Sequence, residues 1–315
     1  MLFQSPMAGE DRFFAKDPCV IRLNGRAYLY YSKPADLSQG WGAYHIGIAV
    51  SDDLEHWTPC GELGPEQPAE GNGVCAPGGI VLNGVVHLFY QSYGQFPKDY
   101  ICHAISTDGI HFVRDPANPI VMPEGDWNIH RAIDADVVAF DDRLLLYWAT
   151  RDPEGRRQML GVSAAPLASA FCRDDWRQLC DAPVLRPELD WEQECIEAPA
   201  AVAYEGRVFL FYGGAYNCCP QQIGCAISDD GVRFTRLSSR PLLPNGPEGS
   251  WNASESGHPY AWTDDDGQTW LFYQGSPDGG RNWLISKARV IFDGDRMPRL
   301  EPDPVRWPSE PCPAT

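Results

Sequence analysis

A short segment rich in aromatic and aliphatic residues recurs along this chain about every 60 residues. Its side chains favour β-structure, and most copies follow a tight-turn signal such as Asn24-Gly25 or Asp266-Gly267. The five copies are residues 28–31, 87–90, 145–148, 209–212 and 270–273. The pattern predicts five equivalent β-strands.

A second segment, which ends in serine, follows each of these strands. The five serines are Ser51, Ser106, Ser163, Ser228 and Ser286. Such a repeat has room for four strands, the size of one propeller blade. We therefore predict an all-β fold, a five-bladed β-propeller with four-stranded antiparallel blades around a central channel. Residues 1–300 would form this single domain and residues 301–315 a Pro-rich C-terminal tail.

The composition indicates a globular protein with a sizeable core, since 43% of the 315 residues are hydrophobic and 12% are aromatic. The chain has no run of about 18 apolar residues, so no membrane span is expected. Met1 to Asp11 lacks the basic start and apolar stretch of a secretory signal. We therefore expect a cytoplasmic protein.

The eleven cysteines do not form a recognisable framework. None belongs to a Cys-x-x-Cys pair, and several lie inside apolar strand patterns, so buried free thiols are expected. The adjacent Cys218-Cys219 pair would bridge only with strain. A zinc site is not expected.

The net charge of −18 argues against nucleic acid and anionic membranes as partners, because both require basic patches. The chain also lacks a phosphate-binding Gly-rich loop, a Gly-x-Ser-x-Gly elbow and a His-Glu-x-x-His pair. We therefore expect no organic cofactor. A small neutral carbohydrate or oligosaccharide is compatible with the acidic surface.

Carboxylates precede three of the predicted aromatic strands, each within an apolar segment. They are Asp17, Asp134 and Glu197, in repeats one, three and four. In a propeller the innermost strands line the channel, so these acids should converge at one end of it. Acids that share an apolar-walled site repel each other, which drives their pKa values apart and suits one to act as an acid and another as a base.

Each of these acids also has an ordinary structural interpretation. An Asp-Pro pair such as Asp17-Pro18 is usually a turn. Asp136 competes with Asp134, and Glu194 competes with Glu197. We favour Asp134 and Glu197 because they are expected to hold the same offset to their strands as Asp17.

The series Asp17-Pro18, Ile133-Asp134 and Glu197-Ala198-Pro199 resembles glycoside hydrolase family 43, over roughly residues 10 to 295. That family comprises five-bladed propellers that hydrolyse arabinosides, xylosides and related glycosides with inversion. The resemblance implies that Asp17 is the general base, Glu197 the general acid, and Asp134 the residue that tunes and orients the acid. Ala135 and Ala198 depart from the family's usual Pro and Gly, which loosens the assignment to a subfamily.

In repeat five the corresponding position holds His258. A lone histidine is most often a satisfied core residue. The resemblance implies that a histidine of this blade contacts a central ion or its waters, so a structural calcium ion at His258 is the alternative. The run from Asp264 to Gly267 is interpreted as a hairpin turn, because it lacks the glutamate of a calcium loop.

Three tryptophans outside the repeating strands, Trp41, Trp127 and Trp251, are candidates for a sugar-binding platform. Packing between blades is an equally good interpretation. His130 and Arg131 directly precede the third-repeat acid and are candidates to reach substrate hydroxyls.

Together these features predict an inverting glycoside hydrolase for a neutral glycoside such as an α-L-arabinofuranoside or a β-D-xyloside. One alternative is a retaining, invertase-like β-fructosidase, whose first two motifs differ from Lys16-Asp17 and Ile133-Asp134. The other is a non-catalytic glycan-binding propeller. Inversion predicts a separation of about 6.5–9.5 Å between the Asp17 and Glu197 carboxyls, against about 5–5.5 Å for retention.

Overall fold

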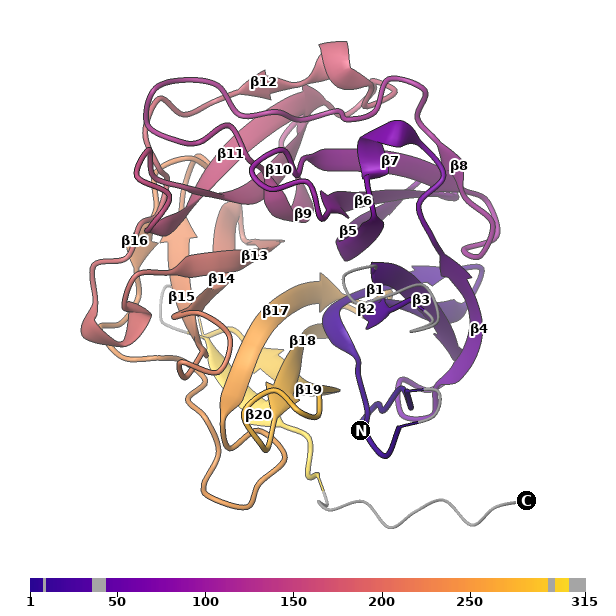
Figure 1. Ribbon diagram of the computed structural model, residues 1–315, viewed down its shortest axis with the longest axis vertical. Coiled ribbons are helices and arrows are strands. Elements are labelled where there is room, and N and C mark those ends of the chain that lie inside the picture. Colours follow the sequence, from indigo (N-terminus) through magenta and orange to yellow (C-terminus); the bar gives the residue numbers. More distant parts are fainter. Residues whose placement is uncertain (8–9, 36–43, 294–297, 306–315) are drawn as a thin grey trace.

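The protein is a ring of five four-stranded antiparallel sheets, as Figure 1 shows, in a computed structural model that describes residues 1–7, 10–35, 44–293 and 298–305. The predicted five-bladed propeller is confirmed. In blade one the strands are β1 (Lys16–Leu23), β2 (Arg26–Pro34), β3 (Tyr44–Ser51) and β4 (Thr58–Leu63). In blade two they are β5 (Gly73–Leu82), β6 (Val85–Tyr93), β7 (Ile101–Ser106) and β8 (Val113–Arg114).

The other three blades repeat this plan. Blade three contains β9 (Ile133–Phe140), β10 (Arg143–Arg151), β11 (Gln158–Pro166) and β12 (Arg177–Gln178). Blade four contains β13 (Ile196–Tyr204), β14 (Arg207–Gly214), β15 (Gln222–Ser228) and β16 (Thr235–Arg236). Blade five contains β17 (Glu255–Thr263), β18 (Thr269–Ser276), β19 (Leu284–Ile291) and β20 (Arg299–Pro302). The described helices are short 3-10 turns, at Pro68–Glu70, Arg173–Asp175 and Asp190–Glu192.

The first strand of every blade faces the centre of the ring, where β1, β5, β9, β13 and β17 contact one another (Figure 1). The predicted aromatic segments lie in the second strands and the serine segments in the third. Trp148, Tyr212 and Phe272 of the second strands are almost fully buried and form much of the packing between blades. The aromatic repeat therefore marks the core of each blade.

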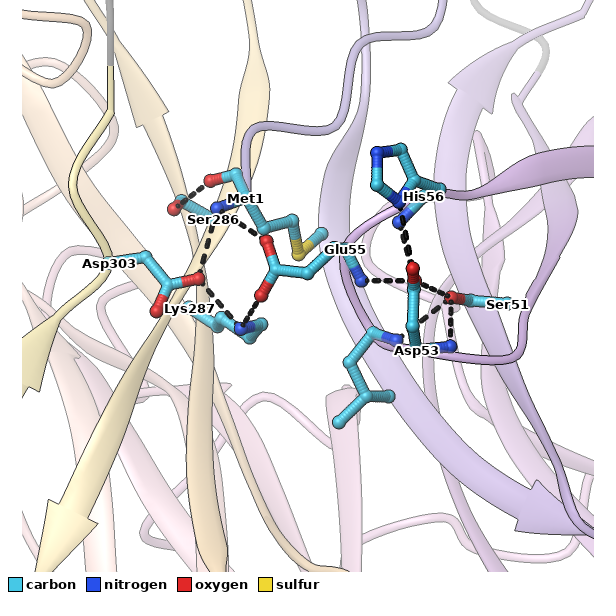
Figure 2. Close-up of polar contacts among 9 residues, drawn as sticks. Met1, Ser51, Asp53, Glu55, His56, Ser286, Lys287 and Asp303 are labelled. Carbon is cyan, nitrogen blue, oxygen red and sulfur yellow. Dashed lines mark hydrogen bonds and ion pairs between the residues drawn. The ribbon is translucent and has the colours of Figure 1, made fainter.

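In three of the five repeats, the recurring serine organises the turn after the third strand. Ser51 Oγ accepts hydrogen bonds from the backbone N–H of Asp53 (3.2 Å) and Leu54 (2.9 Å), a cluster seen on the right of Figure 2. The turns at Ser106 and Ser228 have the same bonds. Two of these turns also join blades, since Tyr30 Oη donates to the Gly109 carbonyl (3.0 Å) and Tyr147 Oη to the Gly231 carbonyl (2.8 Å).

The ring closes where blade five meets the N-terminal segment and blade one. Phe3 and Ile285 of β19 exchange two backbone hydrogen bonds of 2.7 and 3.1 Å. Figure 2 shows the charged contacts beside them: the buried Lys287 ammonium lies 2.5 Å from Glu55 and 2.7 Å from Asp303. The amino group of Met1 contacts the same two carboxylates at 3.1 and 3.0 Å.

Blade five extends slightly further than the predicted domain boundary. Its fourth strand ends at Pro302, and Asp303 then binds Lys287, so residues 301–303 belong to the propeller and not to a tail. Residues 306–315 lie outside the described part of the chain. The run from Asp264 to Gly267 forms the β17–β18 hairpin turn, in which Asp264 pairs with Arg22.

The ten cysteines in the described ranges are free thiols, and most are buried. None of the helices that the structure describes has the length and apolar character needed to cross a membrane.

Candidate active site

Each inner strand carries an irregularity near its start, at the same level of the channel. The register of pairing with the second strand shifts there in all five blades. The residue at the shift has a positive φ, which is uncommon for residues other than glycine. These residues are Asp17 (50°), Ala76 (46°), Asp134 (54°), Ala198 (50°) and His258 (39°). Such bulges redirect side chains, and here they bring Asp17, Asp134 and His258 to one cavity.

The backbone N–H freed at each bulge is bound by a polar side chain from the preceding blade. Asp17 N–H donates to Gln274 Oε1 of blade five (3.0 Å), and Asp134 N–H donates to Gln91 Oε1 of blade two (2.9 Å). The remaining three bonds join Ala76 to Ser32, Ala198 to Asp134 and His258 to Gln221. The position of each site residue thus depends on two blades.

Glu197 does not hold the offset that the sequence suggested. It forms the last regular pair before the shift, with Gly213, as Lys16 does with Ser32. Ala198 is therefore the counterpart of Asp17, and Glu197 is the counterpart of Lys16. The offset argument was wrong for Glu197 by one residue, because Ala198, and not Glu197, directly precedes a proline as Asp17 does.

The two competing acids lie elsewhere. The Glu194 side chain is 54% exposed and pairs with Arg157 (2.9 Å). Asp136 is buried deeper in the channel, where its Oδ2 accepts a hydrogen bond from the backbone of Ala201 (2.6 Å). Neither acid lines the cavity that contains Asp17 and Glu197.

That cavity has a volume of ≈ 320 Å³ and opens at one end of the channel. All three predicted acids line it, with His258 and Arg131. Its other lining residues are Lys16, Tyr44, Cys75, Ala76, Gln91, Tyr93, Ile133, Arg151, Gln158, Tyr216 and Asn217. The mixture of carboxylates, cations, amides and tyrosines suits a polar ligand with several hydroxyl groups.

The imidazole of His258 lies between the base and acid candidates. Its Nδ1 is 2.9 Å from Asp17 Oδ1, and its Nε2 is 3.3 Å from Glu197 Oε1. Neither contact is a well-aligned hydrogen bond, because Asp17 Oδ1 and His258 Nε2 are buried and lack a hydrogen-bond partner among the described residues. Both atoms can therefore form a hydrogen bond with a water molecule or a substrate hydroxyl.

Two buried amides hold the carboxylate of Glu197. Gln221 Nε2 donates to Oε1 (2.7 Å), and Gln158 Nε2 donates to Oε2. Gln221 is fully buried and has space because two neighbours lack a side chain: a Cβ on Gly257 would lie 1.9 Å from its Oε1, and one on Gly213 would lie 3.1 Å from the amide. Sequence reasoning did not identify either glutamine.

The charges of the cavity separate the three acids. Burial acts to raise the pKa of Asp17, but the charges of His258 and Lys16 outweigh it and hold that pKa well below the usual range. Burial raises the pKa of Asp134 to about 6, and the charges of Glu197 and Asp17 add to this effect. Burial also acts to raise the pKa of Glu197, but the adjacent positive charge of His258 and the hydrogen bond from Gln221 outweigh it and lower that pKa.

This order differs from the role of general acid that the resemblance implies for Glu197, because a general acid must be protonated before it can donate its proton. The difference comes from His258, whose pKa the neighbouring Asp17 and Glu197 raise well above its usual value despite its burial. Without a ligand, Asp134 retains a proton to the highest pH among the three acids. A ligand must change the surroundings of Glu197 before that residue can donate a proton.

The tryptophans do not form a platform in this cavity. Trp127 stacks on Trp148 (ring centroids 5.8 Å apart) and Trp251 packs on Tyr273 (5.3 Å). Trp191 stacks on Tyr212 in the same way in blade four (5.9 Å), so this tryptophan is a repeated packing element. Trp251 is buried in the core of blades four and five. Trp41 lies outside the described residues.

Of the two remaining candidates, His130 and Arg131, only Arg131 lines the cavity. The Nδ1 atom of His130 lies 3.0 Å from the Pro123 carbonyl, and His130 is not among the cavity residues. Arg131 lines the cavity and forms a buried ion pair with Asp99 (3.0 Å). The sequence analysis did not identify four further site residues. Lys16 is adjacent to Asp17, and no motif pointed to Arg151, Gln158 or Gln221.

Carboxylates that converge at one end of the channel are an arrangement suited to glycoside hydrolysis, which uses a pair of carboxyl groups on either side of the scissile bond. Residues 11–297 match the glycosyl hydrolases family 43. The chain belongs to this family, and the resemblance found in the sequence is confirmed.

Two curated proteins are similar to parts of the chain. A β-1,2-mannobiose phosphorylase from Thermoanaerobacter sp. (strain X514) is 31% identical over 134 residues, which are 38% of this chain and 42% of that protein. A sucrose-6-phosphate hydrolase from Escherichia coli is 33% identical over 116 residues, 34% of this chain and 24% of that protein. The chain thus spans less than half the length of these relatives.

Solved structures share the fold over nearly the whole chain. A thermostable family-43 glycoside hydrolase has a TM-score of 0.72 at 20% identity and covers 99% of both chains. An endo-1,4-beta-xylanase from Bacteroides thetaiotaomicron VPI-5482 has a TM-score of 0.72 at 19% identity, covering 91% of this chain and 94% of its own. An alpha-L-arabinofuranosidase from Lactobacillus brevis has a TM-score of 0.69 at 18% identity, covering 94% and 96%.

Proposed function

We propose that the protein is an inverting glycoside hydrolase that removes a small neutral sugar, such as an α-L-arabinofuranosyl or a β-D-xylosyl residue. The arrangement of Asp17 and Glu197 on opposite sides of the His258 ring carries this proposal, because inversion requires room for a water molecule between the base and the sugar. The likeness to structures titled xylanase and arabinofuranosidase agrees with the choice of sugars.

Each acid has a separate role in this proposal. Asp17, ionised and with one oxygen free of hydrogen bonds, accepts a proton from the attacking water. Glu197 gives a proton to the leaving oxygen once the bound substrate has changed its contact with His258. Asp134 has one carboxylate oxygen within 4.8 Å of Glu197 and His258, so its charge opposes ionisation of Glu197 and returns that residue to its acid form.

Product stereochemistry tests the proposal directly. A panel of aryl glycosides (arabinofuranoside, xyloside, galactoside and fructoside) would identify the sugar, and NMR in the first minutes of reaction would identify the anomer released. Inversion of the anomeric configuration is expected. Retention, or a glycosyl ester trapped on Asp17, would instead favour the retaining, fructosidase-like mechanism. A folded protein that binds glycans but turns over no glycoside of the panel would favour the non-catalytic alternative.

We also propose that a calcium ion binds through water next to His258 Nε2, an atom without a hydrogen-bond partner among the described residues. One imidazole and two carboxylates meet there, and calcium prefers oxygen ligands, so most of its ligands would be water. Chelation with EDTA should lower the melting temperature or the activity, and calcium should restore it. If EDTA changes neither the melting temperature nor the activity, His258 serves only as an ionic contact between Asp17 and Glu197.

A further inference from the structure

We propose that the cavity includes, on its leaving-group side, a subsite for an acidic group, with Arg151 as the residue that binds it. The proposal rests on the function proposed above and deepens it: the sugar that is removed is neutral, and the group from which it is removed carries a carboxylate or a phosphate. Three observations carry it: the unpaired charge of Arg151, its connection to Glu197 and an exposed aromatic ring.

Arg151 has no anionic partner within the described ranges of the chain. Its hydrogen bonds go to two neutral acceptors, the Gln158 side-chain oxygen (3.2 Å) and the Gly155 carbonyl (3.4 Å). The neighbouring Arg131 differs, because the buried Asp99 carboxylate neutralises it at 3.0 Å. Arg151 therefore brings into the cavity a positive charge that the protein leaves uncompensated.

The position of Arg151 places this charge on the side of the cavity that binds the leaving group. Arg151 binds Gln158, and Gln158 in turn donates to Glu197, the proposed acid. Since the acid protonates the leaving oxygen, the group attached to that oxygen must lie on the side of Glu197. Lys16, the other cation without a carboxylate contact in the cavity, stacks instead on Trp283 (4.3 Å) next to the base.

An exposed aromatic ring adjoins the same place. The Phe96 side chain is 59% exposed, unusual for a large apolar residue, and the guanidinium groups of Arg131 and Arg151 lie 5.4 and 5.6 Å from its ring centre. The Tyr216 ring lies 5.5 Å from Arg151. A ring with one open face can stack on the C–H face of a sugar while the guanidinium binds an acidic substituent.

The chemistry of the cation favours an anion. A guanidinium presents a planar set of donors that matches carboxylate and phosphate oxygens. A chain with a net charge of −18 repels anions from most of its surface. An unpaired arginine in the cavity gives the acidic group a local positive charge that can offset this repulsion. The three acids around the sugar to be removed disfavour an anion there.

Ligand binding to the intact protein tests the subsite without requiring turnover. Calorimetry would compare D-glucuronate and D-glucose 6-phosphate with D-glucose, D-galacturonate with D-galactose, and inorganic phosphate with chloride. We expect at least one acidic sugar to bind at least tenfold more tightly than its neutral parent, with an affinity that falls as salt is raised. Binding by the acidic sugars identifies a substituent of the leaving group, whereas binding by inorganic phosphate alone would contradict this and indicate a free anion.

Three variants complete the test. Arg151→Gln should abolish the preference for the acidic sugar, and Arg151→Lys should retain part of it, because the charge stays although the bond to Gln158 is lost. Arg156→Gln, which removes an exposed charge outside the cavity, should leave the preference unchanged. Equal affinity for acidic and neutral sugars, or an equal loss in the Arg151→Gln and Arg156→Gln variants, would overturn the proposal. Because binding is measured without reaction, failure of the hydrolase assignment would not produce either result.

Discussion

At the scale of single residues, the acids at the centre of the ring differ by their contacts and not by their chemistry. Asp17 faces two cations, Lys16 and His258, and stays ionised. Glu197 is held by amides and by His258, while Asp134 is buried with less compensation. In the proposed mechanism, one carboxyl chemistry thus provides a base, an acid and a residue that tunes the acid, as in other sites where the environment separates titrating groups.

The roles of the base and the acid predict different responses to the leaving group. Asp17→Asn should lower hydrolysis of every glycoside by about 10²–10⁴-fold or more, with ligand binding and melting temperature nearly unchanged. Glu197→Gln should lose activity on natural glycosides but retain much of it on dinitrophenyl glycosides, whose leaving group needs no proton. Steady-state kinetics on both substrate types would show this. Equal losses on the two would transfer the acid role to another residue.

Gln221 should act as a positioning residue for the acid. Gln221→Leu removes the donor to Glu197 Oε1 and the acceptor for His258 N–H, so kcat should fall more on natural than on dinitrophenyl glycosides. Loss of these buried partners should also cost about 1–3 kcal/mol of unfolding free energy. The neighbouring Gln222→Leu, outside the cavity, is the matched control. An equal loss of kcat on both substrates would indicate a purely structural role.

At the scale of the elements, the sequence predicted the strands better than the site. Large aromatic side chains and Asn-Gly turns reveal second strands directly, because both express local preferences of the backbone. Proline follows four of the five bulge residues, as in Asp17-Pro18 and Ala198-Pro199, so the sequence does mark this position. The hydrogen bonds that hold the bulges come from other blades, such as Gln274 to Asp17, and no local pattern encodes them. The convergence of Glu197 with Asp17 and Asp134 was predicted, although its offset was wrong by one residue.

Tryptophan shows a second limit of local patterns. Trp127 and Trp251 lie in polar segments, which are compatible with an exposed ring as well as with a packed one. The decisive observation was the third copy, Trp191, which stacks on its own blade in the same way. Comparing all copies of a repeat, including those without an interesting neighbourhood, would have revealed packing from the sequence.

Two stacked histidines in blade two should make the stability of the fold depend on pH. Burial lowers the pKa of His103 to about 4, and the neighbouring His87 adds to this effect. Between this value and the unfolded pKa of about 6.5, the unfolded chain binds more protons than the folded chain. The contribution of His103 to the free energy of unfolding is therefore fully present above pH 6.5 and falls as the pH is lowered towards 4. This single residue should contribute roughly 3 kcal/mol to the change.

Urea unfolding at pH 7 and pH 4.5 would measure this dependence. His103→Gln should reduce the difference in unfolding free energy between the two pH values, and the exposed His111→Gln should leave it unchanged. A difference of the same size in the His103→Gln variant would assign the pH dependence to other groups.

At the scale of the whole molecule, the ring must close between its first and last blades. Lys287 of β19 binds Glu55 of blade one and Asp303, which follows β20 (Figure 2). Lys287→Met leaves two carboxylates at this junction without that cation, so a loss of about 1–3 kcal/mol is expected in urea unfolding. Lys33→Met, which breaks a partly exposed pair within blade one, should cost less than about 1 kcal/mol. Equal losses of unfolding free energy in the two variants would show that the ion pairs at the junction stabilise the fold no more than an exposed pair does.

The bond from Gln274 to the backbone of Asp17 gives this junction a further importance. Asp17 belongs to the first blade and Gln274 to the last, so this bond holds the proposed base in place only while the two ends of the ring remain together. A slight parting of blades five and one would release the base while every sheet stayed intact. Inactivation by mild heat or denaturant should then precede any change in the β-sheet signal, which makes catalysis a more sensitive reporter of ring opening than spectroscopy.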